Sequence, residues 1–247
     1  MTFFCYLLMA LVTICYCLAG ILPFVVAVSL CAFSRKLIGR ITRFAILFYG
    51  KSIVHIALRP FAKVDFEDME PEQDRGIYIC NHRSASDPFL VSVITRRPAA
   101  QAVNRWPMRL PFFGFFAVLG EYMDVTAMDY EEIRKHSAYL IGQGAPLIIF
   151  PEGTRSGNGE INQFHSTFFR VAKDLSCPII PVAIVGNEHI PSRDFRITCG
   201  HIRIRKLPQI APELIHSLSP FQLKNHVRSL LKKETADMDK ALERSPA

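Results

Sequence analysis

The chain contains 247 residues, half of them hydrophobic, and its 29 Lys and Arg against 22 Asp and Glu give a formal net charge of +7. This length predicts one sizeable domain with attachments. The whole positive excess falls between Ser34 and Val64, where seven Lys or Arg residues occur without an acid. A nucleic-acid-binding domain carries its basic residues over the folded surface, so this local excess argues against nucleic acid as a partner and for contact with anionic membrane lipids.

Residues 1–33 carry no charged side chain. As one helix they would extend roughly 50 Å, against a hydrocarbon core of about 30 Å. Gly20 and Pro23 lie inside the run, so either one tilted, kinked span or a two-helix hairpin in one leaflet accounts for the excess length. A cleaved signal peptide is the competing interpretation, but its basic start is missing and the apolar run is too long. We expect a membrane-embedded segment, and the basic residues after it predict that the rest of the chain faces the cytoplasm.

Residues 34–63 predict a basic amphipathic helix beside the membrane. Five apolar residues share one face at helical spacing, with basic residues along the flank: Leu37, Ile41, Phe44, Ala45 and Phe48, flanked by Lys36, Arg40 and Arg43. This pattern is typical of a helix lying at the membrane interface. The alternative is an ordinary helix that faces a core and has a solvated basic edge.

Residues 64–235 alternate short apolar runs with helical patterns. Strands are predicted at 77–80, 147–150 and 179–185, with a strand pair within 195–206; helices are predicted at 88–96, 128–142, 164–175 and 220–232. Such alternation predicts an α/β domain with a layered, mostly parallel sheet flanked by helices. Residues 236–247 have the composition of a polar tail. None of the seven cysteines has metal-ligand spacing, so no metal site is predicted and the thiols are expected to be reduced.

Two polar clusters follow predicted strands, where sites form in open α/β sheets. The first is NHRSASD, residues 81–87. His82 and Asp87 can meet only if the chain turns between them, and Asp87 before Pro88 is also a typical helix start, so a helix cap and an acid/base pair are both consistent. A histidine held by a carboxylate is suited to accept a proton near neutral pH. The G-x-S-x-G pattern of serine esterases is absent.

The second cluster is PEGTRS, residues 151–156, with Glu152, Gly153, Thr154 and Arg155. An arginine at the head of a loop after a strand can bind phosphate through its planar guanidinium. The pattern is not that of a Walker loop, because G-x-x-x-x-G-K-[ST] is not met. A glycine-rich turn with a surface ion pair is the structural alternative.

The two clusters in this order, followed by IIPVAI, resemble the motifs of the glycerolipid acyltransferases typified by 1-acylglycerol-3-phosphate acyltransferase. The resemblance covers about residues 64–210 and implies a glycerol-3-phosphate acyltransferase-like fold. It implies that His82 is the general base and that Asp87 orients it, while Glu152, Gly153, Thr154 and Arg155 contact the acceptor or its phosphate. The acceptor hydroxyl would attack the thioester of acyl-CoA or acyl carrier protein, a co-substrate rather than a permanently bound cofactor. Backbone N–H groups of the Gly153 loop are candidate oxyanion donors.

The stretch between the clusters departs from the family pattern. Asn104 stands where the family has a lysine, and Val125 follows Asp124 where an arginine is expected. The family uses both cations for the acceptor phosphate. Nearby cations are candidates to compensate: Arg105, Arg109 and Arg134. The acceptor therefore stays open between 1-acylglycerol-3-phosphate and another alcohol, such as a lysophospholipid or an amino-acid lyso-lipid. A catalytically silent lipid-binding protein is the alternative from another class, and the intact His82 and Asp87 disfavour it.

Overall fold

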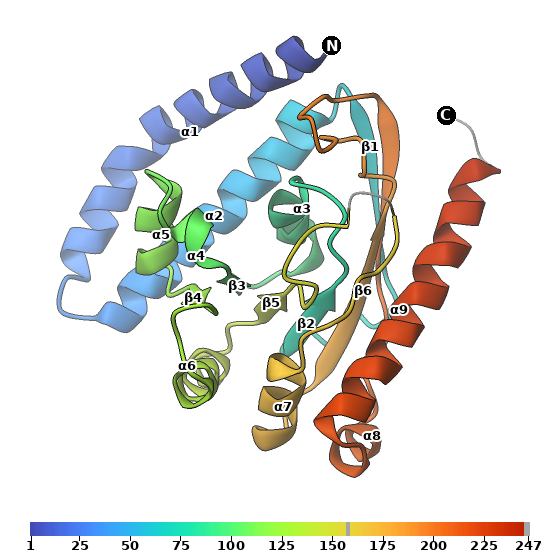
Figure 1. Cartoon of the computed structure of the whole chain (residues 1–247). Helices are drawn as coiled ribbons and strands as arrows, with labels where there is room; N and C mark the ends of the chain where they lie inside the picture. Colours follow the sequence, from blue (N-terminus) through green and yellow to red (C-terminus); the bar gives the residue numbers. More distant parts are fainter. Residues whose placement is uncertain (157–158, 245–247) are drawn as a thin grey trace.

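A computed structural model describes residues 1–156 and 159–244. Its centre is a seven-stranded sheet in the order β1-β7-β6-β2-β5-β3-β4 (Figure 1). The strands are β1 Ala62–Asp68, β2 Ile77–Cys80, β3 Ala100–Val103, β4 Met123–Asp124, β5 Leu147–Ile149, β6 Ile179–Val185 and β7 Gly200–Lys206. All neighbouring pairs are parallel except β6 and β7. The predicted α/β class with a mostly parallel sheet is confirmed.

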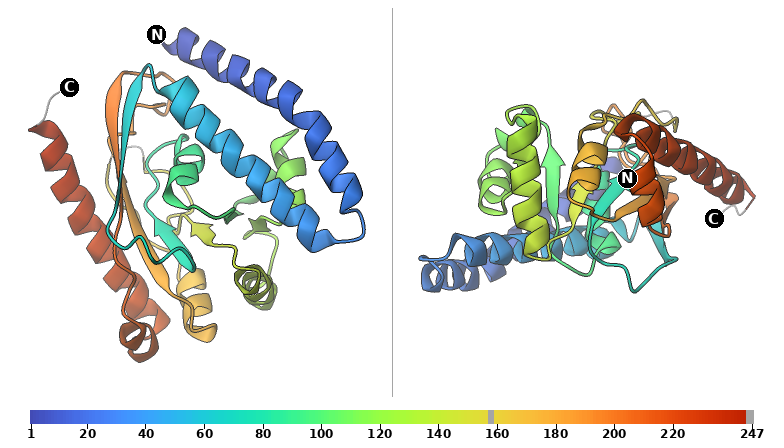
Figure 2. Two further views of the ribbon diagram at one scale, coloured as in Figure 1. Left: turned by 180° about the vertical axis from the view of Figure 1, so that it is seen from behind. Right: turned by 90° about the horizontal axis from the view of Figure 1, so that it is seen from below.

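Helices cover both faces of this sheet (Figures 1 and 2). They are α1 Thr2–Leu30, α2 Arg35–Ser52, the π-helix η1 Ile53–Leu58, α3 Asp87–Ile94, α4 Arg105–Met108, α5 Phe113–Leu119, α6 Tyr130–Gly142, α7 Thr167–Asp174, α8 Pro212–Ser217 and α9 Pro220–Glu243. Strand β2 is buried on both sides: Ile77 and Ile79 join the cluster under α6, α7 and α9, whereas Tyr78 and Cys80 join the cluster under α1, η1 and α3. This alternation is the two-residue period of a strand between two helical layers.

Helix α1 is continuous through Gly20 and Pro23. A hairpin within residues 1–33 therefore does not form; α1 instead returns through a short turn into α2, and the two helices lie side by side (Figures 1 and 2). Helix α1 and the segment Arg35–Leu58 are both long and apolar enough to cross a membrane, with hydropathies of 2.5 and 1.3. Most of α1 is exposed, whereas the second segment is almost half buried in the protein.

Helix α2 packs on the domain with a face different from the predicted apolar one. Leu37 and Phe48 of the predicted face are 45% and 56% exposed. The inward face instead contains Arg43, whose Nη1 lies 2.6 Å from Glu121 Oε2 with both side chains buried. A Cβ at Gly39 would lie 2.3 Å from the same oxygen, so only glycine fits beside this pair. Arg43 was counted among the membrane-facing basic residues, and that assignment is wrong.

Three further expectations differ from the structure. Strands β1, β3 and β4 were not predicted. Within the range of the predicted strand pair only β7 forms, because Phe195 has a φ of +60° and the backbone of Ile197 is bound to Thr2 of α1. Of the predicted polar tail, residues 236–243 continue α9, with Met238 buried in the core; residues 245–247 lie outside the described residues.

Candidate active site

The two polar loops meet at one edge of the sheet. Strands β2 and β5 are parallel neighbours, with Ile79 opposite Ile149, so their carboxyl ends lie together. NHRSASD leaves the first strand and PEGTRS leaves the second. The Ser156 N–H donates to the His82 carbonyl oxygen at 2.8 Å, which joins the two loops directly.

His82 and Asp87 are brought together by the turn between them. His82 Nδ1 lies 2.7 Å from Asp87 Oδ2, and the Asp87 side chain is completely buried. The same oxygen accepts the backbone N–H groups of Arg83 at 2.8 Å and Ser84 at 2.9 Å. Asp87 Oδ1 accepts the side-chain amide of Asn187. Four donors therefore satisfy the hydrogen-bonding capacity that this carboxylate loses on burial.

The alternative that Asp87 caps α3 is wrong. The helix begins at Asp87 itself, and its N-cap residue, Ser86, makes no side-chain cap bond. The N–H groups that Asp87 accepts belong to the loop before the helix rather than to the helix. The carboxylate thus fixes the conformation of the loop that carries His82.

The His82 ring is only partly buried. Its side chain is 19% exposed, and its ring lies 4.7 Å from the Phe150 ring, centroid to centroid. Because the carboxylate accepts the proton on Nδ1, the lone pair of Nε2 is left to accept another. Among the described residues no group hydrogen-bonds to Nε2. This imidazole can take a proton from a hydroxyl placed against it.

Glu152 links the two loops from inside. Its Oε1 accepts the His82 N–H at 2.7 Å, and its Oε2 accepts the Asn162 N–H at 2.8 Å. Burial raises the pKa of this carboxyl group, and the two backbone N–H bonds oppose the rise. Both oxygens are occupied within the protein, which favours a positioning role over the acceptor contact predicted for Glu152.

Gly153 forms the bend of the second loop, with a φ of +70°. Its N–H donates to Phe150 O at 3.1 Å, so it is already used and is not a free oxyanion donor. Its carbonyl oxygen accepts Asn104 Nδ2 at 2.8 Å, which brings the position of the family lysine to this loop. A Cβ on Gly153 would lie 3.3 Å from His165 Nε2, so His165 borders the loop as well. Thr154 is exposed.

Arg155 lies over the Phe195 ring, with its guanidinium carbon 5.5 Å from the ring centroid. Its Nη1 is buried without a hydrogen-bond partner in the described part of the chain. An unpaired buried donor is costly, and a bound anion would satisfy it. Arg155 therefore keeps a buried donor that no described residue uses.

The structure separates the three candidate compensating cations. Arg105 follows Asn104 at the end of β3 and lies 3.4 Å from Asp124. Arg134 is paired with Glu131 on the surface of α6. Arg109 is exposed beyond α4. None of the three hydrogen-bonds through its side chain to the described residues of the two loops; Arg105 is the one that directly follows Asn104, which binds Gly153 O.

Sequence reasoning missed several residues that support the site. Asn187 follows β6, which is parallel to β2, so the polar run Asn187–Glu188 after that strand was a usable signal. Arg83 is buried, donates twice to Asp239 of α9 at 2.9 and 2.7 Å, and pairs with Glu188. Arg193 donates to the Ser156 carbonyl oxygen. No local sequence pattern predicts the contacts of Arg83 and Arg193, because each contact joins segments that lie far apart in the chain.

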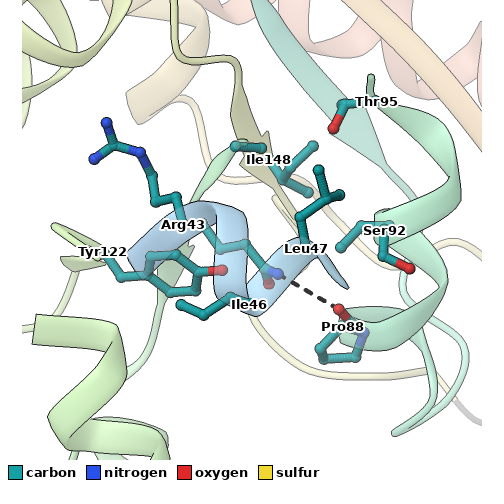
Figure 3. Close-up of a pocket in the computed structure, with 11 residues that line it drawn as sticks. Arg43, Ile46, Leu47, Pro88, Ser92, Thr95, Tyr122 and Ile148 are labelled. Carbon is teal, nitrogen blue, oxygen red and sulfur yellow. Dashed lines mark hydrogen bonds between the residues drawn. The ribbon is translucent and has the colours of Figure 1, made fainter. Parts of the chain in front are cut away.

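A small cavity lies behind α3, between that helix, α2 and the sheet (Figure 3). Arg43, Leu47, Ser92 and Tyr122 line it, and Gln101 donates to Pro88 O across it at 3.5 Å. Its volume is about 20 Å³. That corresponds to about one water molecule, so this cavity does not accommodate an acyl chain.

The model of the acyltransferase family matches residues 62–185, half of the chain. The 1-acyl-sn-glycerol-3-phosphate acyltransferase of Cocos nucifera is 28% identical over 163 residues, which cover 64% of this chain and 50% of that protein. The enzyme of the same name from Salmonella typhimurium is 24% identical over 169 residues, 67% of this chain and 69% of that protein.

The crystal structure of the 1-acyl-sn-glycerophosphate acyltransferase PlsC from Thermotoga maritima has a similar fold. The TM-score is 0.68 at 20% identity, and the match covers 93% of this chain and 95% of that chain. The chain spans about half the length of the first plant relatives it matches.

Proposed function

The chain belongs to the acyltransferase family, and we propose that it transfers a fatty acyl group from an acyl thioester to a hydroxyl group of a lyso-lipid. The observation that carries this proposal is the His82 imidazole, which buried Asp87 holds at Nδ1 and which has no hydrogen-bond partner at Nε2 among the described residues. A catalytically silent lipid-binding protein has no need of a histidine oriented in this way.

In the proposed reaction His82 Nε2 takes the proton of the acceptor hydroxyl while its oxygen attacks the thioester carbonyl carbon. A tetrahedral oxyanion forms and then collapses, so that the C–S bond breaks and the thiol leaves with the proton returned by His82. Asp87 stabilises the imidazolium that exists between these two transfers. The products are the acylated lipid and the free thiol of CoA or acyl carrier protein, and no permanently bound cofactor takes part.

The first candidate acceptor is 1-acylglycerol-3-phosphate, which the names of the relatives suggest. Nη1 of Arg155, which has no hydrogen-bond partner among the described residues, supports a phosphate in this place. A second candidate is a lyso-lipid without a phosphomonoester. It is favoured by the neutral Asn104, whose amide is already bound to Gly153 O where the family has a lysine.

We propose that the reaction takes place at a membrane, with the catalytic domain on its cytoplasmic side. The exposed apolar surface of α1 supports the attachment. The exposed Arg35, Lys36 and Arg40 after this helix support the orientation.

The proposal is tested by mass spectrometry of the products that the purified protein forms from a panel of lyso-lipids with acyl-CoA or acyl carrier protein. His82→Ala should lower kcat by about 10²–10⁴, the usual contribution of a general base. The matched control is His226→Ala, because His226 is exposed on α9 and should leave turnover unchanged. A His82→Ala protein with the turnover of the wild type would exclude this mechanism.

A further inference from the structure

A groove of about 590 Å³ lies between the end of η1 and the start of β1. Its lining includes Val54 and Phe61 as apolar residues and His55, Arg59, Lys63 and Asp65 as titratable ones. It takes no part in the reaction proposed above. Its mixed lining fits a ligand with an anionic group and an apolar part.

The groove opens at the edge of the sheet that carries the candidate active site. The start of β1 pairs with the start of β7, and β7 runs antiparallel to β6, whose end lies beside the end of β2. Strands β1, β7, β6 and β2 are consecutive neighbours, so β1 lies about 14 Å across the sheet from β2. A ligand in the groove and a substrate at His82 would therefore approach the protein from the same side.

The charge balance of the groove favours an anion. Arg59 and His55 make no side-chain hydrogen bond or ion pair with any residue in 1–156 or 159–244. Lys63 pairs with Asp65 at 2.9 Å, but these side chains are 68% and 45% exposed, and such exposed pairs are weak. Asp65 also accepts His201 Nε2 at 2.6 Å. The two positive charges of Arg59 and Lys63 therefore exceed the one negative charge of Asp65, even when His55 and His201 are neutral.

The groove also borders the start of the apolar helix α1. Cys199, which lines the groove, contacts Met1, and Thr2 exchanges hydrogen bonds with the backbone of Ile197. Phe3 and Phe4 at this end of α1 are 73% and 66% exposed.

We propose that this groove binds the phosphoryl group of an amphiphile, with Arg59 and Lys63 as its ligands. The same chemistry is offered by the headgroup of an anionic phospholipid and by the phosphates of a CoA thioester. This site is separate from the proposed acyl transfer and does not depend on it.

The test measures binding of two probes to the full chain in nonionic detergent: short-chain phosphatidylglycerol, with short-chain phosphatidylcholine as its reference, and CoA. The double variant Arg59→Gln with Lys63→Gln should bind at least one anionic probe about tenfold or more weakly than the wild type. The matched control is Lys232→Gln with Lys233→Gln, which removes the same charge from exposed positions on α9. The conservative pair Arg59→Lys with Lys63→Arg should retain binding.

A loss confined to phosphatidylglycerol identifies a site for a lipid headgroup, and a loss confined to CoA identifies a site for the phosphates of CoA. Equal binding by the groove variant and the control, or no binding of either probe by the wild type, overturns the proposal. The His82→Ala protein should bind the probes like the wild type. If the wild type lacks transferase activity but the groove variant still loses binding, the proposed function fails and this site stands.

Discussion

At the scale of single residues, carboxylates hold the loop that presents His82. Asp87 and Glu152 are both buried, and between them they accept four backbone N–H groups, those of His82, Arg83, Ser84 and Asn162. A loop fixed in this way lets the imidazole keep its orientation without help from a substrate. Such preorganisation is what a general base requires.

We predict that Glu152→Gln lowers both stability and turnover, although it keeps the shape of the side chain. The amide NH₂ would face a backbone N–H that Glu152 now accepts, leaving a buried donor unpaired at a cost of about 1–3 kcal/mol. Because burial raises the folded-state pKa of Glu152 above its ordinary value of 4.5, the native state binds the extra proton. The free energy of unfolding therefore falls as pH rises from about 4.5 through the folded pKa.

The measurement is the free energy of unfolding of the wild type and the Gln variant across this pH range. The free energy of unfolding of the wild type should fall over this range, and that of the Gln variant should not show the part of the fall that comes from Glu152. Equal stability of the two proteins at neutral pH, together with a defect only in KM for the acceptor, would favour the predicted acceptor contact instead.

Sequence reasoning could find His82 and Asp87 because both lie in one short cluster after a predicted strand. It also found the loop with Glu152 and Arg155, but it assigned Glu152 to the acceptor since side-chain direction is not visible in a pattern. Asn187 follows a third strand, so its contact with Asp87 could be predicted only from the order of the strands in the sheet. Such a contact depends on the topology of the fold rather than on local sequence.

At the scale of secondary-structure elements, the buried strands β2, β5 and β6 were predictable as short apolar runs. Strand β1 was not, because it is an edge strand with an alternating pattern that merged with the basic segment before it. Helix α9 was predicted to end at residue 232, because its last turns are polar in composition. These turns nevertheless pack on the domain, since Met238 is buried in the core and Asp239 pairs with Arg83.

We predict that the last turns of α9 support the active-site loop through Asp239. Arg83 follows His82, is only 2% exposed, and donates to both carboxylate oxygens of Asp239. In Asp239→Asn the charge is lost and Glu188 remains as the acidic partner, so stability should fall by about 1–3 kcal/mol. Turnover should fall with little change in KM, measured where the variant remains folded.

The control is Asp237→Asn, which removes one charge from an exposed position two residues away on the same helix. It should leave stability and turnover unchanged. If the two variants behave alike, the pairing with Arg83 contributes nothing to the site and α9 only covers the sheet.

At the scale of the whole molecule, the apolar helix and the catalytic domain are one structure rather than an anchor with a separate enzyme. Helix α1 reaches the loop after β6: Tyr6 OH donates to Phe195 O at 3.0 Å, and the Phe195 ring lies under Arg155. Farther along, Tyr16 OH donates to Ala45 O of α2. The composition of residues 1–33 predicted a membrane segment, but nothing in it predicted contacts with the domain.

We predict that deletion of residues 1–33 weakens attachment to phospholipid vesicles and also lowers turnover on a soluble, short-chain acceptor. The first effect follows from losing the exposed apolar surface of α1, and the second from releasing the loop that carries Phe195 beneath Arg155.

Tyr6→Phe separates the two effects, since it removes the bond to Phe195 O and keeps the apolar helix. It should sediment with vesicles like the wild type while its KM for a phosphorylated acceptor rises. A deletion protein with wild-type sedimentation would mean that α2 alone suffices for attachment, and wild-type turnover on the soluble acceptor would mean that α1 does not reach the chemistry.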